Sequence, residues 1–273
     1  MSSALSEHTP VVVCGAAGRM GRRLIALAHA SADLVIAGAV EAAGTPTIGT
    51  DAGELAGIGQ IGLAVTDDLA ACCAPEQVVI DFSVPDATVR HAGIAADRGA
   101  ALVVGTTGLN SQQEEALRAA AGRTRSVLAA NYSVGITVLT ELASRAATLL
   151  DESFEAEIVE IHHHDKKDAP SGTALALGRA VARARQLDFE QARVLGRDGL
   201  VGARTSNEIG IVALRAGDAV GDHTVVLGGL GERLELTHRA QSRDCLVRGA
   251  LRAARWVATR PAGVYTMRDV LGI

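Results

Sequence analysis

Apolar runs alternate with amphipathic stretches over the first half of the chain, which is the pattern of strands and helices in βαβ units. The apolar runs that predict strands are Val11–Gly15, Leu34–Val40, Gln77–Asp81, Ala101–Gly105 and Ser126–Asn131. Between these runs, apolar residues recur at helical spacing, as in Gly18–Ala32, and Pro85 stands where the first turn of a helix accepts proline. Because parallel strands need helical crossovers, residues 11–131 predict a Rossmann-like parallel sheet.

The pattern changes after a long predicted helix at Val134–Leu150. The longer strands predicted beyond it are Phe154–His163, Glu208–Arg215, His223–Gly229 and Arg233–Arg239. One helix, Thr173–Arg185, interrupts them, so we expect an α+β domain built on a mixed open sheet. The amphipathic run Arg243–Thr259 predicts a final helix that returns to the first domain, whereas residues 44–62 show no pattern that assigns them.

We therefore expect an α/β protein of two domains, which a chain of 273 residues is long enough to build. The Rossmann-like domain comprises residues 1–132 plus 243–273, and the second domain comprises residues 133–242. The opening MSSALSEHTP lacks the apolar core of a signal peptide and predicts a short disordered leader. No apolar run approaches the ~20 residues that a membrane-spanning helix requires, so we expect no membrane partner.

Charge and cysteine content restrict the class of partner and the compartment. The net charge is −5 and the Lys and Arg residues are scattered, which argues against a nucleic-acid groove. The cysteines Cys14, Cys72, Cys73 and Cys245 form no CxxC pair, so we expect reduced thiols and a cytoplasmic protein. Cys14 lies inside the first predicted strand and is expected to be a small core residue.

A glycine-rich turn joins the first predicted strand to the first predicted helix. Gly15, Gly18 and Gly21 follow the spacing G-x-x-G-x-x-G, a variant of the dinucleotide-binding G-x-G-x-x-G. Glycines let the backbone approach a pyrophosphate, whose charge is favoured at the N-terminus of a helix. Such turns also occur for steric reasons alone, so this turn by itself does not identify a nucleotide site.

Glu41 strengthens the nucleotide-binding interpretation. It ends the second strand, twenty positions after Gly21, where a carboxylate reaches the ribose hydroxyls of a dinucleotide. The alternative is a solvated surface glutamate, but the order strand, glycine turn, helix, strand and acid favours a nucleotide. The loops Asp81–Pro85 and Gly105–Gly108 end strands of the same sheet and are expected to face the same cleft, although each alone is an ordinary turn. Ala129–Tyr132 ends the last such strand and predicts a hinge.

The segment Glu160–Thr173 joins a predicted strand to a predicted helix and carries most of the candidate chemistry. Ser171, Gly172 and Thr173 can offer hydroxyls and backbone N–H groups at the helix N-terminus to an anion such as a carboxylate. Helix capping alone explains the same three residues, and the two roles are compatible.

Three consecutive histidines raise the question of a metal ion. In an extended strand, His162 and His164 point one way and His163 the other, so three imidazoles cannot converge locally and no metal is expected. Lys166, four residues beyond His162, fits acid chemistry better because an ammonium group can donate a proton. The alternative for Lys166 is a solvated basic loop.

The sequence HHHDKKDAPSGTALALG resembles the signature of the 4-hydroxy-tetrahydrodipicolinate reductase family, whose usual form is H-H-x-x-K-x-D-A-P-S-G-T-A. The resemblance extends over nearly the whole chain. Its further segments are Gly15–Gly21, Asp81–Pro85, Gly105–Gly108, Asn131–Gly135, residues 208–223, Thr237–Arg243 and Met267–Ile273. The histidine–lysine signature is highly specific, whereas the glycine turn is shared with many oxidoreductases.

The resemblance implies an NADH- or NADPH-dependent oxidoreductase of the route to diaminopimelate and lysine, whose substrate is a small cyclic dicarboxylate. By the same resemblance, His162 is a proton donor and acceptor, and Lys166 is the proton donor. The substrate contacts it implies are His163, Gly172 and Thr173, assisted by Ser171 and Arg243. The cofactor contacts it implies are Gly15, Ala16, Ala17, Gly18, Arg19, Met20, Glu41, Phe82, Gly105, Thr106, Thr107, Ala129, Ala130, Asn131 and Tyr132. Members of the family are typically homotetramers joined through sheets of the second domain.

Cofactor choice is the point at which the sequence departs from the family pattern. Ala42 stands where many relatives carry an arginine beside the acid. Because Glu41 faces a 2′-phosphate unfavourably and Arg19 is the one nearby cation of the glycine turn, we expect NADH to be used at least as well as NADPH. Two alternatives remain: another reductase on the same scaffold, or a dinucleotide sensor that would need Glu41 but neither Lys166 nor Arg243.

Overall fold

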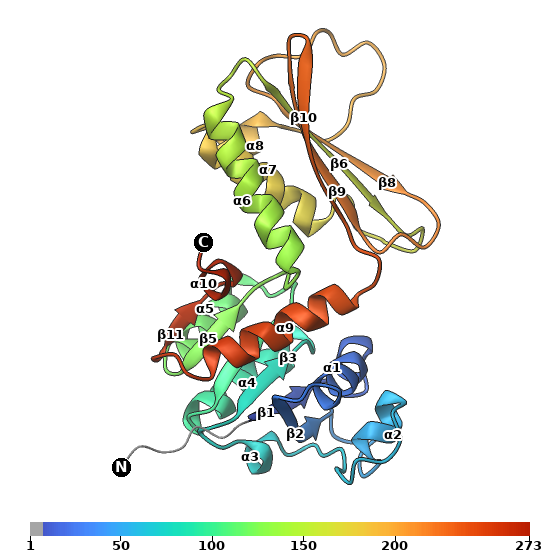
Figure 1. Cartoon of the computed structure of the whole chain (residues 1–273), viewed down its shortest axis with the longest axis vertical. Coiled ribbons are helices and arrows are strands. Elements are labelled where there is room, and N and C mark those ends of the chain that lie inside the picture. The colour runs from blue at the N-terminus through green and yellow to red at the C-terminus, as the bar shows by residue number, and fades with distance from the viewer. Residues whose placement is uncertain (1–7) are drawn as a thin grey trace. The chain divides into compact units, whose positions relative to one another are not determined.

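The computed structural model describes residues 8–273, which divide into two compact units (Figure 1). Unit 1 comprises the described residues up to Tyr132 together with Leu246–Ile273. Unit 2 comprises Ser133–Cys245. None of the helices in the described part of the chain has the length and apolar character needed to cross a membrane.

Unit 1 is built on a parallel sheet. In the described part of the chain the strand order is β11-β5-β4-β3-β1-β2, and all of these pairings are parallel. The strands are β1 (Thr9–Cys14), β2 (Leu34–Val40), β3 (Val78–Asp81), β4 (Ala101–Val104), β5 (Arg125–Leu128) and β11 (Gly263–Tyr265). Consecutive residues such as Val11, Val12 and Val13 are all buried, so both faces of the sheet are covered. The predicted Rossmann-like sheet is confirmed.

The helices of unit 1 lie between these strands or, for α10, after the last of them, and α9 begins at the end of unit 2. They are α1 (Arg19–His29), α2 (Ala52–Ala56), α3 (Leu69–Cys72), α4 (Pro85–Asp97), α5 (Ser111–Ala121), α9 (Asp244–Val257) and α10 (Met267–Leu271). Pro85 occupies the first turn of α4, as predicted. The pattern gave no indication of α2, which forms in the unassigned 44–62 loop because the Asp51 carboxylate accepts hydrogen bonds from Gly53 N and Gly62 N, each at 2.8 Å.

The predicted leader is wrong at its end. Its first seven residues lie outside the described part of the chain, but Thr9 and Pro10 begin β1 and pair with Leu34 and Val35 of β2. The backbone N–H of Thr9 donates to Asp33 O at 2.9 Å. Thr9 and Pro10 can pair with β2, and this pairing makes them part of a strand although the sequence pattern did not predict one there.

Unit 2 is built on a mixed sheet with the order β10-β9-β6-β8-β7 among its described strands. These are β6 (Glu155–His162), β7 (Arg193–Val194), β8 (Ile209–Arg215), β9 (Asp222–Gly229) and β10 (Glu232–Arg239). β6 pairs with β8 in parallel and with β9 in antiparallel register. The predicted mixed open sheet is therefore confirmed.

Helices cover one face of this sheet: α6 (Val134–Leu149), α7 (Gly172–Ala184) and the short α8 (Phe189–Ala192) (Figure 1). The prediction of a single interrupting helix was wrong, because α8 is capped by the Asp188 side chain and packs Phe189 into the core. Along β6, Ala156 and Ile158 are buried under the helices, and the alternate residues are partly exposed.

Tyr132, the last residue of unit 1 before unit 2 begins, ties strand ends together. Its side chain is 1% exposed, and its hydroxyl lies 2.9 Å from Val104 O and 2.8 Å from Val127 O. The hydroxyl is therefore within hydrogen-bond distance of carbonyl groups of two buried residues, Val104 of β4 and Val127 of β5.

We expect Tyr132→Phe to lower the free energy of unfolding of unit 1 by about 1–2 kcal/mol, because two buried carbonyl groups lose their shared donor. Chemical denaturation followed by tryptophan fluorescence measures the loss. Tyr265→Phe is the matched control, since its hydroxyl donates to Pro261 O at an exposed site, and should be nearly neutral. Equal stability of Tyr132→Phe and the wild type would contradict this assignment.

Candidate functional site

The glycine turn of unit 1 packs so tightly that two of its positions require glycine. Gly15 has a φ of +71°, a conformation that favours glycine. A Cβ atom at Gly21 would lie 2.1 Å from Gly15 O, so any side chain there would push α1 away from the turn. The predicted turn is therefore placed where the N-terminus of α1 meets the end of β1.

Glu41 follows β2 and faces this turn. Its Oε2 accepts a hydrogen bond from Ala17 N and its Oε1 accepts one from Ala42 N, both at 2.9 Å. The alternative of a solvated surface glutamate is wrong, because the carboxylate is bound to the glycine turn across 24 residues of sequence. The Glu41 carboxylate therefore stabilises the glycine turn, and Glu41 also lines the cavity beside the turn.

A cavity of about 620 Å³ lies at the carboxyl ends of β1, β2 and β3. Its lining includes the predicted residues Gly15, Ala17, Gly18, Glu41 and Phe82. It also includes Ala42, which stands beside the acid, and Ser83 and Val84 of the Asp81–Pro85 loop that was expected to face this cleft. The lining residues that the sequence did not single out are Thr45, Pro46, Thr47, Ala87, Arg90 and His91. Because β1 and β3 are neighbours at the point where the strand order reverses, this is where a sheet of this kind binds a dinucleotide.

Asp81 fixes one wall of this cavity from within. The carboxylate is fully buried and accepts hydrogen bonds from Ser83 N at 2.7 Å and from His91 Nδ1 at 2.7 Å. Burial opposes ionisation, but the bonds from His91 and Ser83 outweigh it and hold the pKa of Asp81 below its ordinary value. The ring of His91 is thereby held in the cavity lining. Nothing in the sequence indicated this role, because His91 is an ordinary helix position six residues after Pro85.

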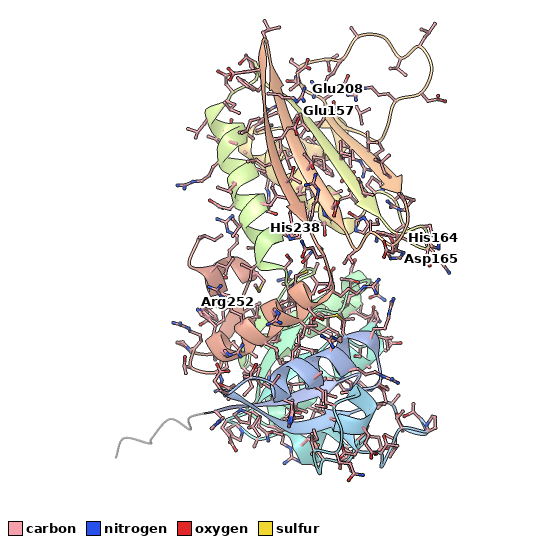
Figure 2. The ribbon with its side chains drawn as sticks, turned by 45° about the vertical axis from the view of Figure 1, so that its right-hand side comes forward. Glu157, His164, Asp165, Glu208, His238 and Arg252 are labelled. Atoms are coloured by element: carbon pink, nitrogen blue, oxygen red, sulfur yellow. The ribbon has the colours of Figure 1, made fainter. Side chains whose placement is uncertain are left out.

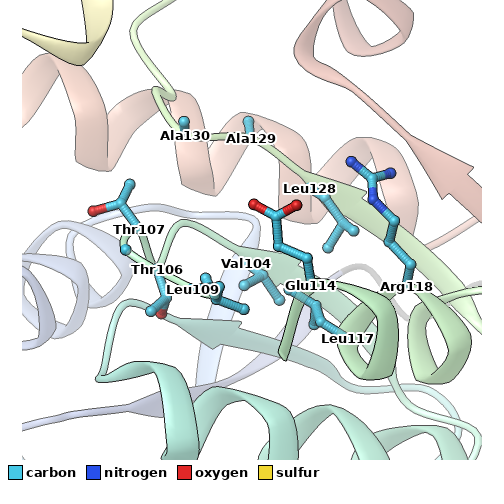
Figure 3. A pocket seen from close by; sticks show the side chains of 11 residues that line it. Val104, Thr106, Thr107, Leu109, Glu114, Leu117, Arg118, Leu128, Ala129 and Ala130 are labelled. Atoms are coloured by element: carbon cyan, nitrogen blue, oxygen red, sulfur yellow. The ribbon is translucent and has the colours of Figure 1, made fainter. Parts of the chain in front are cut away.

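A second, smaller cavity of about 250 Å³ lies at the ends of β4 and β5 (Figure 3). It brings together the predicted residues Thr106, Thr107, Ala129 and Ala130. Its other wall comes from α5, where Glu114 and Arg118 point their charged groups toward the opening (Figure 3). The sequence did not predict these two residues, because they lie on an ordinary amphipathic helix.

Two of the predicted cofactor residues have their side chains in the core. Ala16 is fully buried, and the Tyr132 ring is buried against Phe82 with 5.4 Å between ring centroids. Phe82 also explains Gly105, since a Cβ atom there would lie 2.0 Å from the Phe82 ring. Ala16 and Tyr132 can therefore meet a cofactor only through their backbone in this conformation.

In unit 2 the histidine run does not continue β6. The strand ends at His162, whose carbonyl accepts the hydrogen bond of Ala216 N, and the chain then turns. The expectation that His163 and His164 alternate as strand residues is wrong. The exposed His164 instead bonds through Nδ1 to Gly217 O at 2.9 Å, beyond the end of the sheet (Figure 2).

His162 lies in a buried polar cluster with Glu160. The Glu160 carboxylate is fully buried and bonds to His162 Nδ1, to Ser171 N at 3.0 Å and to Arg215 Nη2 at 3.2 Å. Burial raises the pKa of Glu160, but these three donors outweigh it and leave the carboxylate ionised. Burial is also the largest influence on His162 and lowers its pKa, against the opposing effect of Glu160.

His223 completes the cluster from β9. Its Nε2 lies 3.2 Å from Ser171 Oγ, and its ring contacts that of His162 edge to face with 5.2 Å between centroids. Burial, followed by the neighbouring His162, lowers the pKa of His223 to about 4, so the ring is neutral near pH 7. The sequence did not single out His223 or Arg215, because register across the sheet and not local spacing brings them to Glu160.

Ligand atoms of Glu160, His162 and His223 lie within 4.8 Å of one another, as do those of Cys14, Asp81 and His91. In the first group, the negative charge of Glu160 is already compensated, because Arg215 and Ser171 N bind its carboxylate. The expectation that the protein uses no metal stays a prediction.

The other predicted residues of unit 2 differ in their surroundings. The Lys166 ammonium binds both oxygens of Asp168, at 2.8 and 2.9 Å. Ser171 caps α7 by accepting from Ala174 N, and the position of a Cβ atom at Gly172 meets nothing within 4 Å. Arg243 is exposed just before α9 and has no hydrogen bond or ion pair with the described residues. Unit 2 thus combines a buried neutral histidine, a paired lysine, a helix N-terminus with space beside Gly172 and an exposed guanidinium group.

Comparison with known proteins identifies the family. The model "Dihydrodipicolinate reductase, N-terminus" matches residues 9–132, and "Dihydrodipicolinate reductase, C-terminus" matches residues 135–271. A 4-hydroxy-tetrahydrodipicolinate reductase of Halorhodospira halophila is 49% identical over 261 residues, covering 96% of this chain and 98% of the relative. One of Anaeromyxobacter dehalogenans is 50% identical over 265 residues, covering 97% and 98%.

A solved structure supports the fold independently. The dipicolinate-bound dihydrodipicolinate reductase from Paenisporosarcina sp. TG-14 superimposes with a TM-score of 0.74 at 20% identity, covering 96% of this chain and 98% of the other. The sequence matches cover both units and the glycine turn as well as the histidine–lysine segment. The chain belongs to the dihydrodipicolinate reductase family.

Proposed function

We propose that this protein reduces 4-hydroxy-tetrahydrodipicolinate to tetrahydrodipicolinate with NADH or NADPH, in the biosynthesis of diaminopimelate and lysine. The observation that carries the proposal is the His162–Lys166 segment, which leads directly into the open N-terminus of α7. An acid and an anion site in one segment suit a dicarboxylate that must be held and protonated. Relatives that are about 50% identical over nearly the whole chain are named 4-hydroxy-tetrahydrodipicolinate reductases.

The substrate's two carboxylates require two separate anion contacts. We assign one to Ser171, Gly172 and Thr173 at the start of α7, and the other to Arg243, with His163 beside them. Lys166 donates a proton to the ring carbon next to the one that is reduced, and water is lost from the hydroxylated carbon. His162 accepts or donates a proton at Nε2. Bound NADH or NADPH supplies the hydride.

For the cofactor we propose the loop-end residues of unit 1. They are Gly15, Ala16, Ala17, Gly18, Arg19, Met20, Glu41, Phe82, Gly105, Thr106, Thr107, Ala129, Ala130, Asn131 and Tyr132. The two cavities at the strand ends support this assignment, because together they include most of these residues. These residues need only bind the dinucleotide, at the edge of the parallel sheet where the strands end.

We also propose a cytoplasmic homotetramer joined through the sheets of unit 2. Val159, Ile161 and Leu214 lie on the sheet face opposite the helices, and Ile161 and Leu214 are neighbours in register. Leu214 is 45% exposed. An apolar face of this kind is typical of a sheet that packs against another copy.

The proposed reaction is tested by following NADH and NADPH oxidation with substrate formed in situ from pyruvate and aspartate semialdehyde. We expect turnover that depends on both precursors. Absence of oxidation with either cofactor, in a protein that binds NADH, would overturn the proposed function.

Lys166→Ala should lower kcat by roughly 10²–10⁴-fold, the range typical of a lost general acid. Cofactor affinity, measured by fluorescence titration with NADH, should be nearly unchanged. Lys167→Ala is the matched control, because Lys167 is an exposed neighbour and should leave kcat close to the wild-type value. A Lys166→Ala variant that retains more than half of the wild-type kcat would contradict the assignment.

Arg243→Lys should raise KM for the dicarboxylate by about tenfold, since lysine cannot copy the two-pronged contact of a guanidinium group. NADH affinity should change much less. Arg248→Lys, an exposed arginine of α9, is the control for a general charge effect. An unchanged KM would show that Arg243 makes no carboxylate contact.

NADH should serve at least as well as NADPH, because the Glu41 carboxylate opposes a 2′-phosphate and Ala42 offers no cation. Arg19 and Arg90 lie in or near the same site and should make the preference modest, around tenfold or less. The measurement is kcat/KM for both cofactors in the wild type and in Ala42→Arg, which should favour NADPH. A strong wild-type preference for NADPH, or no gain from the added arginine, would refute this account.

A further inference from the structure

Glu160 is the buried charge that the proposed mechanism leaves without a role. It lies two residues before His162 on β6, so both side chains point to the same face of the strand. The residue is fully buried, and a carboxylate in such a position is costly unless donors satisfy it. The question is what this charge contributes beside the histidine.

The two carboxylate oxygens have different partners. Oε2 is bonded to His162 Nδ1, and Oε1 accepts from Ser171 N at 3.0 Å and from Arg215 Nη2 at 3.2 Å. One oxygen therefore faces the histidine, and the other holds the backbone at the start of α7. Ser171 Oγ in turn caps α7 and lies 3.2 Å from His223 Nε2.

These partners determine where the proton of the imidazole resides. An ionised carboxylate can only accept hydrogen bonds, so His162 Nδ1 must carry a hydrogen. In the neutral ring, Nε2 is then the atom with a free lone pair. His162 faces Glu160, Lys166, Arg215 and His223 from the surrounding elements, and among these Glu160 is the acceptor at Nδ1.

We propose that Glu160 is a positioning residue: it fixes His162 as the Nδ1–H tautomer, with Nε2 directed to the substrate, and joins that orientation to the start of α7. The kinetic part of this inference rests on the proposed function, whereas the tautomer does not. The carboxylate thus couples the proton-transfer residue to the anion site through its two oxygens, one bonded to His162 and the other to Ser171 N.

Glu160→Gln separates the two roles, because only one of its terminal atoms can accept. The amide oxygen should take the Oε1 position, where Ser171 N and Arg215 both donate, and the amide N–H₂ group should then face His162 Nδ1. The ring must accept there and carry its hydrogen on Nε2. We expect kcat to fall by at least roughly tenfold because the histidine is held in the wrong tautomer, with KM for the dicarboxylate within about threefold of the wild type.

The tautomer itself is read from two-dimensional ¹H–¹⁵N spectra of protein labelled at histidine. The His162 signals are assigned by their loss in His162→Gln. We expect protonated Nδ1 in the wild type and protonated Nε2 in Glu160→Gln. This result is independent of turnover, so a wild-type protein without reductase activity would overturn the proposed function and still test the inference.

Glu208→Gln is the matched control. Glu208 also accepts from a backbone N–H, that of Thr205, and from an arginine, Arg197, but it lies far along the sheet from the histidine run (Figure 2). Its kcat and the His162 signals should remain at wild-type values. The inference is overturned if neutral wild-type His162 carries its hydrogen on Nε2, if Glu160→Gln keeps the wild-type tautomer, or if it retains more than half of kcat. If Glu160→Gln fails to fold, the tautomer of His162 in the wild-type protein alone tests the inference.

Discussion

Asp81 in unit 1 and Glu160 in unit 2 are carboxylates that no water reaches, and each lies at or near the end of a central strand. Such a charge is tolerated only when several donors surround it. Asp81 therefore holds Ser83 N and the ring of His91, while Glu160 holds Ser171 N and the ring of His162. In both units the loop that follows the strand is held to the end of the sheet by a bond to the buried acid.

Much of the fold could be predicted because its signals are local. β2 begins and ends where the apolar run does, and α6 and α7 differ from prediction by only one residue at their ends. The short elements could not be predicted, because they exist through distant partners. β11 is only three residues long and forms by pairing with β5, more than a hundred residues earlier. Tertiary pairing, not residue preference, creates such a strand.

The site residues, too, include some that have a local signal in the sequence and others that depend on distant partners. Ser171, Gly172 and Thr173 could be placed at a helix N-terminus because capping residues act over one turn. The residues beside Glu160 on the neighbouring strands could not, since the register of β8 and β9 with β6 brings Arg215 and His223 to the cluster. The same register explains the error over the histidine run, because the β6–β8 pairing stops at His162 opposite Arg215 and leaves the following residues free to turn.

The buried cluster also explains why the proposed site needs a lysine as well as a histidine. Burial lowers the pKa of His162, so its ring is mostly neutral near pH 7 and holds few protons to give. Lys166 is partly exposed and its ammonium group is paired with Asp168, whose pKa the lysine lowers. A charged donor is thus kept beside a neutral ring whose Nε2 can accept. If the histidine were protonated, it would add a second positive charge near Arg215, and the Glu160 carboxylate that it contacts is already shared with Arg215 and Ser171 N. The division of roles between the two residues therefore follows from the limited capacity of one buried acid.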